Sequence, residues 1–100
     1  MKLRVAQDQK YVDEDWWEWS VWIDGPADEL NEVKQVTYKL HPTFKKPVRV
    51  TDDRANKFKL KSDGWGTFPI RVKLELKTGA IIKLEHQLEL LYPDGTLNGD

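Results

Sequence analysis

The chain has 100 residues, of which 39% are hydrophobic and 33% are charged, and its formal net charge is -1. This length suits a single domain over residues 1–100, and this balance excludes a disordered chain. The near-neutral charge excludes strong charge-driven binding to nucleic acid, and the absence of cysteine excludes disulfides, thiolate metal sites and cysteine nucleophiles.

Apolar and polar residues alternate with a period of two along most of the chain, which is typical of half-buried β-strands. In chain order the pattern predicts strands at about residues 2–11, 17–24, 35–40, 48–50, 57–61, 67–77 and 80–91. Turn signals such as Gly25-Pro26 and Asp63-Gly64 separate these segments, and Lys77 to Ala80 is typical of a tight hairpin. The only helix candidate, Ala27 to Asn31, is very short.

Seven strands without a long helix to cover them predict two sheets packed against each other. We therefore expect an all-β fold, an immunoglobulin-like β-sandwich of about seven to eight antiparallel strands. In the strand at 17–24, Trp19 is in phase with Val21 and Ile23 and is expected in the core, whereas Trp22 falls on the opposite face.

The sequence contains few residues of the kinds that catalyse reactions. Its two histidines are His41 and His86, and His86 follows the apolar phase of the last strand, where we expect a hydrogen-bonded core residue. The consecutive carboxylates at 13–15 are interpreted as an acidic turn, and the lysines at 57, 59 and 61 as a solvated strand face. No nucleophile elbow, phosphate-binding loop or zinc motif is present, so we predict no enzyme activity, no metal and no cofactor.

Two loops carry aromatic residues that no strand pattern explains. Trp65 lies between Gly64 and Gly66, whose backbones can adopt unusual φ values. The other loop is Leu40 to Phe44, in which His41 and Thr43 point the same way if the chain is extended, so that His41 can fix the Thr43 hydroxyl. Two such loops at one end of a sandwich suggest a narrow slot between aromatic faces, which suits a flat, neutral, polar group such as an amide.

These stretches resemble the YEATS domain family, immunoglobulin-like readers of acylated lysine. The similar segments are Glu18 to Pro26, Leu40 to Phe44 with Pro47 to Val50 behind it, and Gly64 to Phe68. Order and spacing agree over about residues 15–92, and the compact length is similar to a minimal, prokaryotic version of the family.

The resemblance implies a role for each residue of the slot. Phe44 and Trp65 would be its walls, the Thr43 hydroxyl would bond the acyl amide with His41 orienting it, and the Trp65 N–H would bond the acyl oxygen. Gly64 and Gly66 would belong to the same binding loop. Trp17 and Phe68 are expected at the rim.

The partner that follows is an acetylated or crotonylated lysine on a peptide or protein, histone-like in a eukaryote and unknown in a prokaryote. With no signal peptide or membrane span in the sequence, we expect a soluble intracellular protein, cytoplasmic in a prokaryote and nuclear in a eukaryote. Two alternatives remain open. One is a protein–protein interaction module whose slot is closed or repurposed. The other is a carbohydrate-binding sandwich that uses Trp16, Trp17 and Trp22 as a stacking platform.

Overall fold

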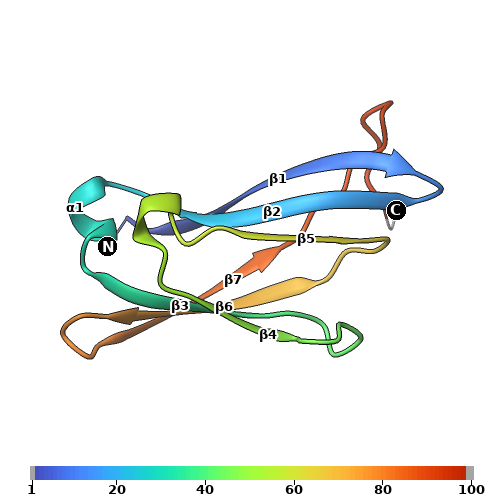
Figure 1. The fold of residues 1–100 in the computed structure, drawn as a ribbon. Helices are drawn as coiled ribbons and strands as arrows, with labels where there is room; N and C mark the ends of the chain where they lie inside the picture. Colours follow the sequence, from blue (N-terminus) through green and yellow to red (C-terminus); the bar gives the residue numbers. More distant parts are fainter. Residues whose placement is uncertain (1, 99–100) are drawn as a thin grey trace.

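The computed structural model describes residues 2–98, so of the domain expected over 1–100, residues 1, 99 and 100 lie outside the described range. Within residues 2–98 the chain forms seven strands, one short α-helix and one 3-10 turn (Figure 1). Their bounds are β1 Arg4–Asp13, β2 Trp16–Asp24, α1 Ala27–Leu30, β3 Val33–Lys39, β4 Val48–Thr51, the 3-10 turn Arg54–Asn56, β5 Leu60–Gly64, β6 Pro69–Leu76 and β7 Ile81–Gln87.

The strands form two antiparallel sheets that stack face to face, which confirms the expected β-sandwich. One sheet has the order β1-β2-β5 and the other the order β4-β3-β6-β7. Figure 1 shows the three-stranded sheet above the four-stranded one, with α1 and the β6–β7 hairpin at one end. At the opposite end the β1–β2 hairpin, the β3–β4 and β5–β6 connections and the C-terminal segment come together.

The alternation of the sequence determines which side chains fill the space between the sheets. Trp19, Val21 and Ile23 of β2 are at most 3% exposed, as their phase predicts. Burial of such side chains contributes roughly 1.5–3 kcal/mol each. The core is completed by residues of the facing sheet and of the C-terminal segment, among them Val36, Tyr38, Ile70, Val72, Leu74, Leu88 and Leu90.

The strand predicted at 57–61 is shorter than expected, because the chain reverses direction just before it. Lys57 and Phe58 both have positive φ angles, of 54° and 57°, so neither continues a strand. Lys57 follows the 3-10 turn, and the Phe58 side chain is fully buried. The prediction that the lysines at 57, 59 and 61 share one face of a strand is therefore wrong. Only Lys61 lies in β5, while Lys59 sits 5.4 Å above the ring of Trp22.

The last strand predicted, at 80–91, ends at Gln87. Beyond it, the backbones of Glu89 and Leu91 bond to side chains of the other sheet, whereas the Leu88 N–H still donates to the Phe68 carbonyl oxygen at 3.2 Å. Glu89 N–H donates to Gln7 Oε1 at 2.9 Å, Leu91 N–H donates to Gln9 Oε1 at 3.1 Å, and Leu91 carbonyl oxygen accepts from Trp17 Nε1 at 2.8 Å. These bonds satisfy backbone groups that a β-ladder would otherwise pair.

Candidate functional site

The connection from β3 to β4 forms a tight turn at the end of the molecule where the loops gather (Figure 1). The Phe44 N–H donates to the His41 carbonyl oxygen at 3.1 Å, which closes a four-residue turn with Pro42 at its second position. Proline suits this position because its ring fixes φ near the value that the turn requires. Leu40 is buried in the core and anchors the start of the turn. His41, Thr43 and Phe44 are thus presented from a backbone of defined shape.

The hydrogen bond expected between His41 and Thr43 is present, and a second contact determines its direction. His41 Nδ1 lies 2.9 Å from Thr43 Oγ1 and 3.3 Å from the backbone nitrogen of Thr43. Because a backbone N–H can only donate, Nδ1 is an acceptor and the imidazole proton is on Nε2. The Thr43 hydroxyl therefore donates its hydrogen to Nδ1, and its oxygen keeps lone pairs free to accept a bond from outside.

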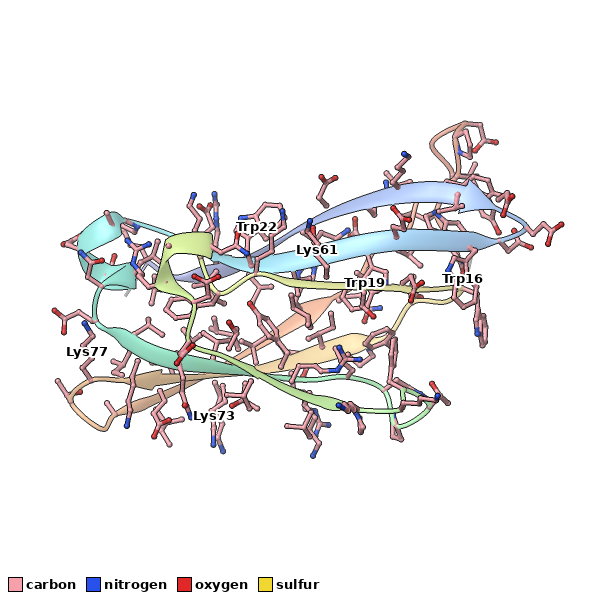
Figure 2. The ribbon with its side chains drawn as sticks, viewed as in Figure 1. Trp16, Trp19, Trp22, Lys61, Lys73 and Lys77 are labelled. Atoms are coloured by element: carbon pink, nitrogen blue, oxygen red, sulfur yellow. The ribbon has the colours of Figure 1, made fainter. Side chains whose placement is uncertain are left out.

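Phe44 forms an aromatic wall that rests on the core. Its ring centroid lies 5.3 Å from that of Phe68 and 6.4 Å from that of Trp19, which it meets nearly at right angles. Phe68 and Trp19 are buried, and Trp19 is seen between the two sheets in Figure 2. One side of Phe44 is therefore supported by packed rings while the other remains available, since the residue as a whole is only half-buried.

Trp65 stands out from the β5–β6 connection with 69% of its surface exposed. Its carbonyl oxygen accepts a hydrogen bond of 2.9 Å from Asn98 Nδ2, which ties this loop to the C-terminal segment. Neither Gly64 nor Gly66 has a positive φ, so the expectation of unusual φ values at these glycines is wrong. A Cβ built on Gly64 would meet only Trp19 Nε1 at 3.9 Å and Phe44 Cζ at 4.0 Å, so what the glycine provides here is space.

A pocket of about 430 Å³ lies between these two loops, within the usual size range of small-ligand sites. All six residues expected to bind the ligand line it, namely His41, Thr43, Phe44, Gly64, Trp65 and Gly66. Of the two residues expected at the rim, Phe68 lines it. The remaining lining residues are Trp16, Lys45, Asp63 and Thr67. The sequence motifs far apart in the chain thus converge on one cavity.

Trp17 does not lie at the rim as expected. It is fully buried, its ring packs against Tyr11 and Tyr92 with centroids 5.1 and 5.0 Å away, and its Nε1 donates to the Leu91 carbonyl oxygen at 2.8 Å. Its neighbour Trp16, 40% exposed, lines the pocket instead. The alternation of β2 contained this signal, because Trp17 has the same phase as the core residue Trp19.

The positions of the tryptophans speak against a closed slot and against a carbohydrate-binding platform. A closed slot would bury Trp65 against its own domain, and Trp65 is instead largely exposed. A stacking platform would need three coplanar rings, but Trp17 is in the core, and Trp16 and Trp22 lie at opposite ends of β2 (Figure 2).

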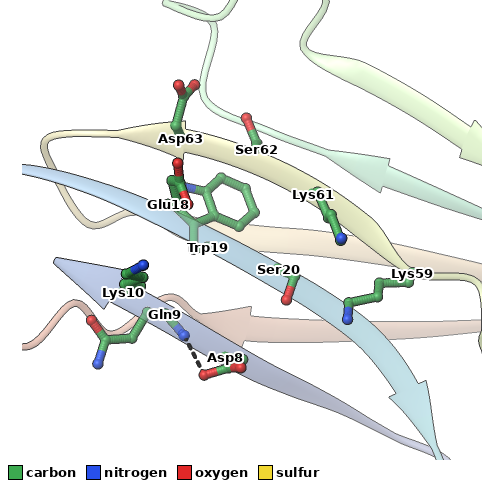
Figure 3. A pocket seen from close by; sticks show the side chains of 10 residues that line it. All are labelled: Asp8, Gln9, Lys10, Glu18, Trp19, Ser20, Lys59, Lys61, Ser62 and Asp63. Atoms are coloured by element: carbon green, nitrogen blue, oxygen red, sulfur yellow. Dashed lines mark hydrogen bonds between the residues drawn. The ribbon is translucent and has the colours of Figure 1, made fainter. Parts of the chain in front are cut away.

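A second hollow, of about 540 Å³, lies on the outer face of the three-stranded sheet (Figure 3). Side chains of both charges line it, including Asp8, Lys10, Glu18, Lys61 and Asp63. Its volume is larger than that of the pocket between the loops. Because it lacks facing apolar walls, we take the smaller pocket as the candidate site.

His86 is hydrogen-bonded as expected, since its Nε2 lies 2.7 Å from Gln7 Oε1, although it is only half-buried. Burial lowers the pKa of His86, partly opposed by the charge of Glu89. Within residues 2–98, no group of three or more His, Cys, Asp or Glu side chains is placed to hold a metal ion. No helix of that part of the chain has the length and apolarity needed to cross a membrane.

The chain is similar to a known protein family and to several characterised proteins. The family model described as prokaryotic YEATS domain matches residues 17–89. Protein AF-9 homolog of Eremothecium gossypii is 38% identical over 77 residues, which cover 72% of this chain and 36% of that protein. For the Saccharomyces cerevisiae AF-9 homolog the identity is 34% over 77 residues, covering 72% of this chain and 33% of that protein. The chain thus spans about a third of the length of these relatives.

Solved structures share the fold. The Yaf9 YEATS domain recognizing the H3K122suc peptide superposes with a TM-score of 0.65 at 25% identity, over 90% of this chain and 78% of that chain. The Yaf9 YEATS domain bound to H3K27ac gives a TM-score of 0.69 at 24% identity, over 93% of this chain and 78% of that chain. The strand arrangement and the sequence motifs point to the same family.

Proposed function

Because the chain belongs to the prokaryotic YEATS domain family, we propose that it is a non-catalytic binding module for acylated lysine, with the side chain entering the pocket between Phe44 and Trp65. A secondary amide has one donor and one acceptor, and inside an apolar slot each needs a partner, since an unmet polar group costs about 1–3 kcal/mol. The pocket has the chemistry to supply both.

The observation that carries the proposal is the bonding of Thr43. Since its hydroxyl hydrogen is directed to His41 Nδ1, Thr43 Oγ1 faces a ligand as an acceptor and suits the N–H of an acyl-lysine amide. The oxygen of the acyl amide would then accept a hydrogen bond from the backbone N–H of Trp65. The rings of Phe44 and Trp65 would cover the two faces of the amide.

Acylation also explains why a lysine side chain would enter at all. It removes the ammonium charge, and with it the large cost of burying an ion. Flat, conjugated acyl groups such as crotonyl are expected to stack between the rings better than acetyl. The carrier would be an acylated peptide or protein. The acylated histone H3 peptides named for the Yaf9 domains are ligands of those proteins and serve here as a guide to the class of ligand.

The test is a ¹⁵N NMR titration with crotonyl-lysine, acetyl-lysine and unmodified forms of one peptide. We expect the indole signal of Trp65 and the amide signals of Thr43 and Phe44 to shift with the acylated forms only. Trp65→Ala should weaken binding at least about tenfold, the loss of roughly 1.4 kcal/mol of contact.

The control for the titration is Trp22→Ala on the outer sheet face, away from the pocket, which should bind like the parent. Trp65 is 69% exposed, so its replacement should leave the fold intact. Absence of any shift at millimolar acyl-lysine would reject the reader function in favour of a protein-interaction module.

A further inference from the structure

The outer face of the four-stranded sheet places like charges opposite each other. Lys39 of β3 lies opposite Arg71 of β6 in the strand register. Further along β6, Lys73 lies opposite Lys83 of β7. All four side chains are exposed, and Figure 2 shows Lys73 projecting from this face, away from the other sheet. Like charges directly opposite on neighbouring strands destabilise a sheet. We call these four residues the basic face.

The described part of the protein does not neutralise the basic face. Two glutamates, Glu75 and Glu85, occupy the same side of the sheet, and Glu85 lies opposite Arg71. Neither forms an ion pair, because the one ion pair among residues 2–98 joins Arg4 to Asp24 in the other sheet. Proteins depart from such local rules of stability mainly where residues serve a function. The four cations are therefore candidates for contact with an anionic partner.

The small net charge of the chain conceals an uneven distribution. Residues 33–51 and 69–87, which contain the four strands of this sheet, hold nine Lys or Arg and two Glu, a net charge of +7. Since the whole chain carries -1, the other residues carry -8. Exposed charges act over roughly 8–10 Å at physiological salt. An anion that stays on the basic face is attracted, whereas a long polyanion that extends past it meets repulsion.

We propose that the basic face binds an acidic segment of a partner protein, at a surface separate from the pocket between the loops. Carboxylates of the segment would lie among the four cations. At the open edge of the same sheet, Val48 and Val50 of β4 are 53% and 59% exposed. They lie opposite Lys39 and Thr37, so they border the basic face and offer a surface to apolar side chains of the segment.

A protein segment fits this face better than nucleic acid does. Proteins bind single strands by stacking bases on aromatic rings, and the exposed positions of these four strands, all within the described residues, hold no aromatic side chain. A duplex would extend beyond the sheet toward the negative remainder of the molecule. Its phosphates would also leave the exposed valines without a contact.

The experiment uses a hexaglutamate peptide flanked by leucines, with a hexaglutamine peptide of the same design as the control. In ¹⁵N NMR titrations we expect the amide signals of the basic face to shift with the glutamate peptide only. The signals of Thr43 and Trp65, at the pocket, should stay in place. Raising the salt concentration from about 50 to about 300 mM should weaken binding, because exposed charges are screened.

The variant Lys73→Glu separates binding from folding. It removes one cation of the basic face and places a carboxylate opposite Lys83, so that repulsion becomes attraction. We expect the affinity for the glutamate peptide to fall about three- to tenfold. The folding equilibrium constant, measured by urea denaturation, should rise about two- to fivefold. Damage to the fold would instead lower both quantities.

The matched control is Lys61→Glu, which changes the net charge by the same amount on the other sheet and should bind the peptide like the parent. If the glutamate peptide shifts no signal at millimolar concentration, or if Lys73→Glu binds it as the parent does, the basic face is rejected as a binding surface. A short DNA duplex that shifts these signals when the peptide does not would show that an acidic protein segment is the wrong partner. No acyl group is present in these titrations, so their outcome is independent of acyl-lysine recognition.

Discussion

Thr43 and His41 act as a pair in which the histidine determines what the threonine can offer. With its hydrogen held by His41 Nδ1 at 2.9 Å, the Thr43 oxygen is an acceptor. The sequence predicts this pair, because alternate positions of an extended loop face the same way. It does not predict the direction of the bond, which depends on the second contact of Nδ1 with the Thr43 backbone.

The first prediction at this scale concerns that hydroxyl. Thr43→Val keeps the shape but leaves the ligand amide N–H unpaired, so affinity for crotonyl-lysine should fall by about tenfold or more. Thr43→Ser keeps the hydroxyl and should retain most of the affinity. Isothermal titration calorimetry measures both. Equal binding by the valine variant would remove Thr43 from the site.

The second prediction concerns His86 and stability. Burial holds the pKa of His86 below its ordinary value of 6.5, so the unfolded chain takes up this proton before the folded chain does. The free energy of unfolding should therefore be highest above pH 6.5 and fall as the pH drops through the folded pKa. For one proton the slope cannot exceed about 1.4 kcal/mol per pH unit.

Urea titrations of the parent and His86→Gln at pH 7.5 and 5.5 check this expectation. The glutamine keeps a hydrogen-bonding side chain but does not titrate, so the loss of stability between the two pH values should be smaller in the variant. The same loss in both proteins would assign it to other groups.

At the scale of elements, the β2 strand was predicted almost to the residue, whereas the segment before β5 was not. A period of two assumes that the chain stays extended, and Lys57 and Phe58 depart from that with positive φ. A local hydrogen bond holds this turn from within, and tertiary bonds to Lys57 and Phe58, one of them from the Ile23 N–H to the Lys57 carbonyl at 3.0 Å, fix it against the sheets. The Phe58 N–H donates to the Asp53 carbonyl at 2.9 Å, and the Phe58 carbonyl accepts from the hydroxyl of Tyr38 at 2.7 Å, on the facing sheet.

This strain gives a prediction at Lys57. Lys57→Gly places at φ 54° the residue that tolerates it best and should raise the free energy of unfolding by about 1 kcal/mol. Lys61→Gly, at an extended position of β5, should lower it by about 0.5–1 kcal/mol. Chemical denaturation measures both changes. A loss of stability at Lys57 would mean that its side chain matters more than its backbone.

At the scale of the whole molecule, the C-terminal segment joins the two sheets. Leu88 and Leu90 are completely buried, and the backbone between them bonds to Gln7 of the opposite sheet. Asn98, at the far end of the same segment, holds the Trp65 carbonyl. The core and the candidate pocket thus depend on one stretch of chain.

We expect Leu90→Ala to lower the free energy of unfolding by about 2–5 kcal/mol, because it removes a buried side chain and leaves a cavity. Leu97→Ala, at a position 40% exposed, should cost much less. Thermal unfolding followed by near-ultraviolet circular dichroism compares the two. Equal, small effects would show that the segment is not part of the core.

The sequence by itself determined the fold class, the core phase of β2 and the two loops that carry the site, because strand alternation and turn residues act between near neighbours in the chain. Only the tertiary structure decided that Thr43 and Trp65 face one pocket, that Trp16 rather than Trp17 lines it and that Asn98 holds its loop. These features arise where separate segments meet as the sheets pack. Such meetings depend on the geometry of the whole sandwich rather than on any local pattern.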